Sequence, residues 1–166
     1  PTNSIGLLVN PNNQTTEAST RDLQAAARSV GQSTLVLNAS READFDAAFA
    51  TLIHERAGAI MVSGDALFQN RRGRLVELAA QQKMPAIYGR REYPNIGGLM
   101  SYGASTLDQY RQSGLYVGRI LKGVRPADLP VLQPTKFELV INLSRLDMVS
   151  PDSQASACLP SGRNST

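Results

Sequence analysis

The chain has 166 residues, of which 42% are hydrophobic and 19% charged, and its formal net charge is +3. This length and composition predict one globular domain with a substantial core and argue against global disorder. No apolar run approaches the roughly 18 residues that a membrane helix needs. Basic residues do not interleave with aromatic ones as a nucleic-acid-binding surface requires, so we expect no nucleic-acid partner.

One cysteine, Cys158, and one histidine, His54, limit metal and redox chemistry. A single cysteine excludes an internal disulfide and a thiolate metal cluster, and a single histidine excludes a multi-histidine site. We therefore expect no metal and no cofactor. The chain begins at Pro1 without an initiator methionine or a signal peptide, so we expect a processed product or an excised fragment.

The first 58 residues alternate between short apolar runs and amphipathic helical patterns. Residues 4–10 form an apolar run that a proline stops, which is typical of a strand buried on both faces. Thr15 or Thr16 can cap the next helix, a second strand is predicted at 34–38, and Ser40 can cap a second helix. The apolar stripes predicted for the two helices are Leu23, Ala26, Ala27 and Val30, and then Phe45, Ala48, Phe49 and Leu52.

The alternation continues with strands predicted at 59–62, 85–88 and 99–102. A helix after the first of these carries Leu67, Leu75, Leu78 and Ala79 on its apolar face. Residues 89–96 are polar and typical of a loop that lines a site or a hinge. A last helix, at 107–122, has one apolar face formed by Leu107, Tyr110, Gly114, Val117 and Leu121.

Strands that alternate with helices through short loops predict an α/β fold, with an open parallel sheet and helices on both faces in three layers. The predicted single lobe covers residues 1–143. Residues 144–166 lack apolar periodicity and are rich in serine and proline. For this tail we expect a poorly ordered or divergent segment, or else a packed extension.

In open α/β sheets, ligands bind at the carboxyl ends of the strands. The residues at those positions are mostly amides, hydroxyls and phenols, which exchange hydrogen bonds without an unusual pKa and suit a polar or zwitterionic solute. Asp65 could hold a ligand's ammonium group, although capping a helix is an equally ordinary role for it. Arg90 and Arg91 could clamp a carboxylate, although exposed arginines seldom do so. The candidate ligand-binding residues are Asn10, Asn12, Ser63, Asp65, Tyr88 and Tyr102.

Familiar enzyme motifs are absent from the sequence. Asn-Pro-Asn-Asn stands where a dinucleotide-binding glycine motif would follow the first strand, and no Walker A loop or nucleophile elbow is present. A phospho-receiver domain would need an aspartate at the end of the third strand, which here ends at Val62 and Ser63. We therefore expect no catalytic residue and no enzymatic activity.

Seven segments, in order along the chain, resemble one known family: residues 5–13, 22–28, 44–49, 98–103, 116–123, 126–130 and 134–142. Together they make residues 5–143 similar to the second half of an ABC-transporter substrate-binding protein. The resemblance is to the tryptophan- and tyrosine-type solute receptors, which have the type I periplasmic-binding fold.

This resemblance implies a receptor in which two lobes close on a solute and deliver it to an ABC permease in the membrane. It implies a periplasmic or extracytoplasmic location and a small polar or zwitterionic solute, such as an amino acid. Residues 97–142 would cross between the lobes, so the apolar face of the helix at 107–122 would lack its partner. We expect that helix to fold back on the sheet or to form a homodimer with a second copy. The alternatives are a ligand-sensing domain of a transcription regulator and then a Rossmann-like enzyme.

Overall fold

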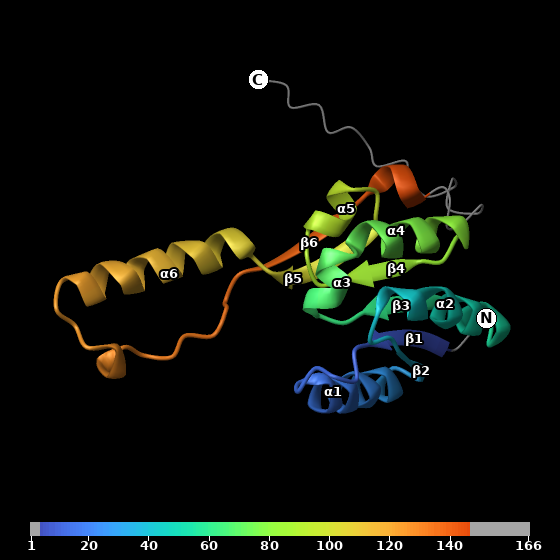
Figure 1. Ribbon diagram of the computed structural model, residues 1–166, viewed down its shortest axis with the longest axis horizontal. Coiled ribbons are helices and arrows are strands. Elements are labelled where there is room, and N and C mark those ends of the chain that lie inside the picture. The colour runs from blue at the N-terminus through green and yellow to red at the C-terminus, as the bar shows by residue number, and fades with distance from the viewer. Residues whose placement is uncertain (1–3, 147–166) are drawn as a thin grey trace, which may run out of the picture.

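The computed structural model describes residues 4–146, which form one six-stranded sheet with helices and a protruding arm (Figure 1). The strand order is β2-β1-β3-β4-β5-β6. The first five strands are parallel, and β6 pairs antiparallel with β5. The strands are β1 (Ser4–Val9), β2 (Ser33–Asn38), β3 (Ala59–Val62), β4 (Ala86–Tyr88), β5 (Met100–Ala104) and β6 (Phe137–Ile141).

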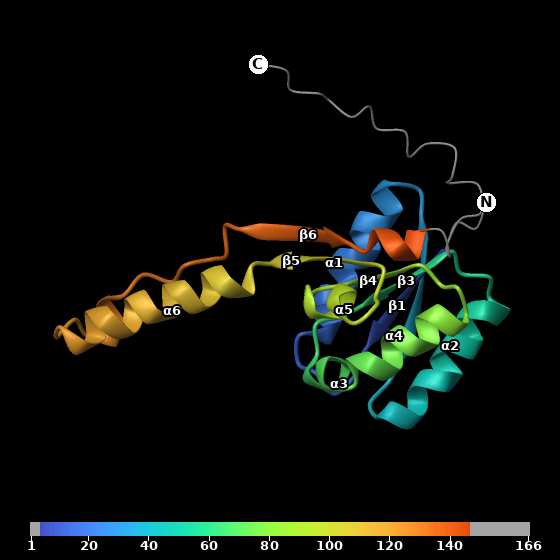
Figure 2. The ribbon, with the colours of Figure 1, turned by 90° about the horizontal axis from the view of Figure 1, so that it is seen from above.

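Helices cover the two faces of the sheet unequally (Figure 2). One helix, α1, lies over β1 and β2 on one face, while α2 and α4 pack together over the other face. The three-layer α/β arrangement predicted from the sequence is thus confirmed. The helices are α1 (Thr16–Ser29), α2 (Phe45–His54), α3 (Ala66–Asn70), α4 (Arg72–Gln81), α5 (Glu92–Asn95) and α6 (Thr106–Leu121), and short 3-10 turns lie at η1 (Glu42–Asp44), η2 (Pro126–Asp128) and η3 (Leu143–Arg145).

The core lies between the sheet and helices α2 to α4. The face predicted for α2 is confirmed, because Phe45, Ala48, Phe49 and Leu52 are all buried. Helix α1 is different, since none of its residues is fully buried. Its predicted stripe is therefore only partly correct: Val30 is 70% exposed. The α1 face of the sheet is the less completely covered one.

The β5–β6 hairpin continues this open face. Residues paired across an antiparallel ladder lie on the same side of the sheet, and Tyr102 pairs with Leu139 while Ala104 pairs with Phe137. The rings of Tyr102 and Phe137 stack with their centroids 5.8 Å apart, and both side chains are more than half exposed. This hairpin therefore presents an apolar surface to solvent.

Three details differ from the sequence prediction. The last strand runs antiparallel, because the chain leaves the sheet after β5 and returns to it from the opposite direction. The helix predicted around residues 65–80 is divided at Arg71 into α3 and α4. The segment 89–96, expected as a loop, contains the single turn α5, whose Tyr93 and Pro94 are buried.

Helix α6 projects away from the sheet together with the connector that returns to β6 (Figures 1 and 2). Its side chains Leu107 and Leu121 are 79% and 82% exposed, and Tyr110 is 73% exposed. The expectation that this helix folds back on the sheet is therefore wrong. The predicted tail, residues 144–166, lies outside the described residues from position 147 onward.

Candidate functional site

The carboxyl ends of β1, β3 and β4 border a cavity of about 470 Å³. The loops after these strands place amide, hydroxyl and charged side chains on its wall, as expected for the ligand-binding edge of an open α/β sheet. The polar residues and glycines of its lining are Asn13, Ser63, Gly64, Asp65, Gln69, Asn70, Gly89, Arg90 and Tyr93.

Asp65 joins two of these loops. Its Oδ1 accepts hydrogen bonds from the Leu67 backbone N–H (2.8 Å) and from Asn10 Nδ2 (3.1 Å), and its Oδ2 accepts one from Asn13 Nδ2 (2.9 Å). The helix N-cap role that the sequence allowed for Asp65 is confirmed by the bond to Leu67. The carboxylate therefore holds the β1–α1 loop against the start of α3.

The same hydrogen bonds determine the ionisation of Asp65. Partial burial pushes the pKa of its carboxyl upward, but the bonds from Asn10, Asn13 and the backbone amides of Leu67 and Phe68 outweigh this effect and leave the pKa below its usual value. Asp65 is therefore ionised at neutral pH.

The β1–α1 loop is held in place by its own asparagines. Asn10 Oδ1 accepts from the Asn12 backbone N–H (3.0 Å), and Asn13 Oδ1 accepts from both the N–H and the hydroxyl of Thr15 (3.0 and 2.9 Å). The Thr16 hydroxyl donates to the Asn10 carbonyl at 2.6 Å. With their amide oxygens used inside the loop, Asn10 and Asn13 direct their NH₂ groups at Asp65.

The six predicted residues are only partly brought together. Asn10 and Asp65 are in contact, and Ser63 lines the cavity beside Asp65. Asn12 is exposed and lies outside this wall. Tyr102 is 57% exposed and lines a neighbouring cavity of about 230 Å³ on the α1 side.

Tyr88 is the predicted residue whose setting differs most from expectation. It is only 2% exposed, and its ring stacks on Tyr93 with the centroids 4.2 Å apart. Tyr88 therefore lies mainly in the core, although it also lines the neighbouring cavity together with Tyr102. The physical reason is the strand's alternation, because Ala86 and Tyr88 both point to the side that α4 covers.

Burial raises the pKa of both stacked phenols. For Tyr93 the rise, opposed by the nearby charges of Arg72 and Arg90, brings the pKa to about 12. Burial likewise raises the pKa of Tyr88 well above its usual value. At neutral pH both hydroxyls keep their protons, so Tyr93, which lines the cavity, carries no charge.

The two arginines after β4 have different surroundings. Arg91 lies 3.5 Å from Glu138 Oε2, and Glu138 Oε1 accepts a 2.6 Å hydrogen bond from the Ser105 hydroxyl. Arg91 is therefore part of the junction between the sheet and the arm. Arg90 is exposed and lines the cavity; its carbonyl accepts from the Tyr93 backbone N–H, but no described residue forms a hydrogen bond or an ion pair with its side chain.

Three residues of the cavity wall are not among the six candidates predicted from the sequence: Asn13, Arg90 and Tyr93. A signal for Asn13 existed, because it belongs to the same asparagine-rich turn as Asn10 and Asn12. The sequence allows Arg90 to clamp a carboxylate, but no sequence pattern separates it from its neighbour Arg91. Tyr93 reaches the cavity through the unpredicted turn α5.

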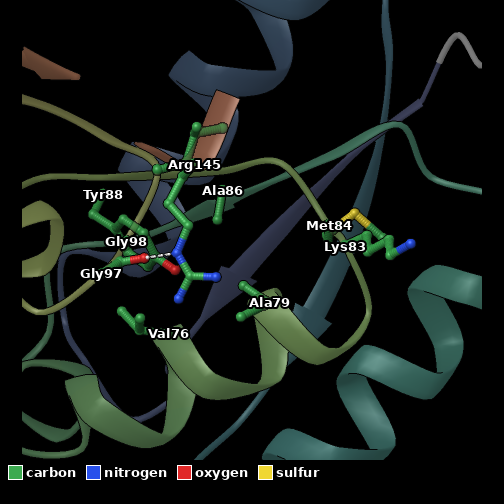
Figure 3. Close-up of a pocket in the computed structure, with 11 residues that line it drawn as sticks. Val76, Ala79, Lys83, Met84, Ala86, Tyr88, Gly97, Gly98 and Arg145 are labelled. Carbon is green, nitrogen blue, oxygen red and sulfur yellow. Dashed lines mark hydrogen bonds between the residues drawn. The ribbon is translucent and has the colours of Figure 1, made fainter. Parts of the chain in front are cut away.

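A third, much smaller cavity lies between α4 and the start of β5 (Figure 3). Arg145 fills most of it and donates from Nε to the Gly97 carbonyl at 2.7 Å. Gly97 has a φ of +102°, and an added Cβ would lie 3.1 Å from the Arg145 guanidinium. The remaining space, about 30 Å³, is the size of one water molecule, so this cavity is a packing feature.

Within residues 4–146, no cluster of three or more histidine, cysteine, aspartate or glutamate side chains is arranged to hold a metal ion. No helix in that range is long and apolar enough to cross a membrane.

Sequence comparison identifies the family. The model of the ABC transporter substrate binding protein family matches residues 1–150. The chain belongs to this family. No curated protein is similar enough to the chain to count as a match.

Three solved structures share the fold. A conserved domain protein from Vibrio cholerae has a TM-score of 0.79 at 24% identity, over 89% of this chain and 49% of its own. An ABC domain from Streptococcus pneumonia, in complex with L-Trp, has a TM-score of 0.75 at 22% identity, over 86% of this chain and 49% of its own. A ligand-free, open substrate binding protein with adhesive properties from Clostridium difficile has a TM-score of 0.66 at 18% identity, over 88% of this chain and 49% of its own. This family member thus spans about half the length of the solved structures it matches.

Proposed function

We propose that this chain is one lobe of the solute-binding component of an ABC-type uptake transporter. The observation that carries the proposal is the cavity of about 470 Å³ at the carboxyl ends of β1, β3 and β4, in a chain that belongs to the substrate-binding family. Its polar groups are amides, hydroxyls and two charged groups, of which Asn13 and Asp65 are held by loop hydrogen bonds, and this lining suits recognition of a polar solute.

The solute class that fits best is a small zwitterion such as an amino acid. The cavity wall carries a guanidinium that can bind a carboxylate, and the neighbouring cavity adds the ring of Tyr102 as an apolar surface. The L-Trp complex of the Streptococcus structure makes amino acids the first ligands to test. The candidate contacts on this lobe remain Asn10, Asn12, Ser63, Asp65, Tyr88 and Tyr102, with Tyr88 acting from the core.

A second lobe would complete the cleft. The chain spans about half of each matched structure, and helix α6 exposes Leu107, Tyr110 and Leu121 on an arm that has no packing partner among residues 4–146. Burying such side chains is worth roughly 1.5 to 3 kcal/mol each, so a lobe that covers α6 would be held firmly. In this proposal the complete receptor works outside the cytoplasm and delivers its solute to an ABC permease.

The test is a thermal-shift screen of the two-lobed parent protein against the twenty amino acids, beginning with L-tryptophan. A ligand at a hundredfold to thousandfold excess over its Kd should stabilise the receptor by about 2.7 to 4.1 kcal/mol. The isolated 166-residue chain serves as the control and should shift little, because it offers only half of the cleft. A parent that shifts with no amino acid would remove this ligand class.

The alternative, also expected from the sequence, is that a second copy of this chain covers the exposed apolar side chains of α6. Light scattering of the isolated chain tests it, with Leu107→Glu and Leu121→Glu as variants that place charge on the exposed face. A dimer that both variants dissociate would support self-association through α6. A monomer at all concentrations would contradict it and leave the face to the second lobe.

A further inference from the structure

Two charged side chains line the cavity at the strand ends, and they differ in how many hydrogen-bond partners they have within the protein. Asp65 is surrounded by donors: Asn10, Asn13 and the backbone N–H of Leu67 all donate to its two oxygens at 2.8 to 3.1 Å. A carboxylate offers about four acceptor positions, and these bonds occupy most of them. Little capacity is left for the ammonium group of a ligand.

Arg90 is the charged group that remains available. Its side chain is exposed at the cavity wall, and the described residues give it no carboxylate partner. Its neighbour Arg91 is already paired with Glu138. Arg90 also lies within electrostatic reach of the Tyr93 phenol, since its charge lowers the pKa of that group against the effect of burial. The guanidinium and the neutral O–H of Tyr93 therefore belong to one donor surface.

The rest of the wall adds groups that can both donate and accept hydrogen bonds. Gln69 and Asn70 contribute amide groups and Ser63 a hydroxyl, while Asp65 supplies the wall's single carboxylate. Guanidinium groups bind carboxylates through two parallel hydrogen bonds, and such charge-assisted bonds are about twice as strong as neutral ones. The group that matches this wall is an anion.

We propose that Arg90 is the ionic contact of this lobe and that the cavity takes a carboxylate group of the solute, while Asp65 is a positioning residue that holds the β1–α1 loop against the start of α3. This inference rests on the proposed function and deepens it by naming the chemical group that this half of the cleft recognises. The solute's ammonium group, if it has one, is then recognised elsewhere in the receptor.

The first test needs no transporter and uses the chain itself. Amide NMR spectra of the 166-residue chain are recorded with sodium acetate and with methylammonium chloride, each compared with sodium chloride at equal ionic strength. We expect acetate to shift the amide signals of residues 63–65 and 89–90, and methylammonium to leave them unchanged. Arg90→Gln should abolish the acetate shifts, whereas Arg91→Gln, the matched control, should keep them. Shifts with methylammonium, or equal acetate shifts in wild type and Arg90→Gln, would overturn the proposal.

The second test uses the two-lobed parent with three probes: L-tryptophan, indole-3-propionate without the ammonium group, and tryptamine without the carboxylate. Arg90→Gln should weaken binding of the two carboxylates roughly ten- to a hundredfold and leave tryptamine unchanged. Asp65→Asn should weaken L-tryptophan and indole-3-propionate by the same factor, because a positioning residue does not distinguish ligands by their ammonium group.

A loss confined to L-tryptophan in Asp65→Asn would make Asp65 the ammonium contact and refute the assignment. If the parent binds no amino acid but the chain still shows the acetate response, the proposed amino-acid function fails while the anion site stands. If the parent binds and the acetate response is absent, the anion site fails while the function stands.

Discussion

Gly103 is the position where an added methyl group should damage the site most directly. In strand β5, a Cβ at this position would lie 3.0 Å from the Gly89 carbonyl carbon and closer still to the Gly89 oxygen. Carbon atoms in contact normally lie about 3.5 to 4.0 Å apart, so the carbon contact alone requires the two backbone segments to separate by roughly 0.5 to 1 Å, and the closer oxygen requires more. Neither segment can rotate away as a side chain would, because both are main chain.

We therefore expect Gly103→Ala to lower the free energy of unfolding by about 1 to 3 kcal/mol, the usual cost of overpacking a tight contact. The matched control is Gly73→Ala in helix α4, where no atom lies within 4 Å of an added Cβ. Replacing an exposed helical glycine by alanine stabilises a protein by about 0.5 to 1 kcal/mol, so the two identical changes should have opposite signs.

Urea unfolding of wild type and both variants, followed by circular dichroism, measures the two effects with the slope m as a check on two-state behaviour. Because Gly89 precedes Arg90, Gly103→Ala should also alter the acetate response of residues 89–90. A Gly103→Ala protein as stable as wild type would refute the reasoning, since it would mean that β5 and the β4–α5 turn do not lie as close as the structure places them.

Three further predictions follow from burial and ionisation. Burial raises the pKa values of Tyr88 and Tyr93, so two of the five tyrosines should ionise late in an absorbance titration, and stability that is complete below pH 10 should fall as the pH rises towards 12. Fluorescence or near-ultraviolet unfolding curves at pH 9 to 12 would detect this, and an unchanged Tm would contradict it. Leu52→Ala should cost about 2 to 5 kcal/mol in urea unfolding, and the adjacent Ile53→Ala, at a 46% exposed position, should stay within about 0.5 kcal/mol. Because the pKa of Asp65 is lowered, its contribution to stability is present above its ordinary pKa of 3.8 and is lost as the pH falls through the lower folded value. Asp65→Asn should therefore be less stable than wild type at pH 7, and the two proteins should converge in acid; a constant difference down to pH 2 would exclude this linkage.

The alternation of elements could be predicted from the sequence because each one has a local cause. The face of α2 that carries Phe45 and Phe49 repeats at the helical period, and both residues are buried as that period predicts. Asp65 directly precedes a helical pattern, which is the ordinary place for an N-cap. Such features depend on neighbours within a few positions, and the sequence contains those neighbours.

Other features depend on contacts between distant segments. Tyr88 faces the core because its side chain points to the side of the three-residue strand β4 that α4 covers. Which side α4 covers depends on the packing of the whole domain. The difference between Arg90 and Arg91 comes from Glu138, which lies 47 positions beyond Arg91 and returns beside it only when β6 pairs with β5. No local pattern contains this information, so the free arginine could not be separated from the paired one in advance.

The arm that carries α6 leaves and re-enters the sheet at a single point. Ala104 pairs with Phe137, and the Ser105 N–H donates to the Lys136 carbonyl at 2.9 Å, so β5 and β6 form a hairpin whose turn has been replaced by residues 106–135. Lengthening a loop costs only about 0.6 kcal/mol per doubling, so replacing a two-residue turn by this segment, about four doublings, costs the sheet roughly 2.4 kcal/mol. We therefore expect that a two-residue Asn-Gly turn can replace the arm without loss of the sheet. The arm itself can then be inserted at the tip of another β-hairpin.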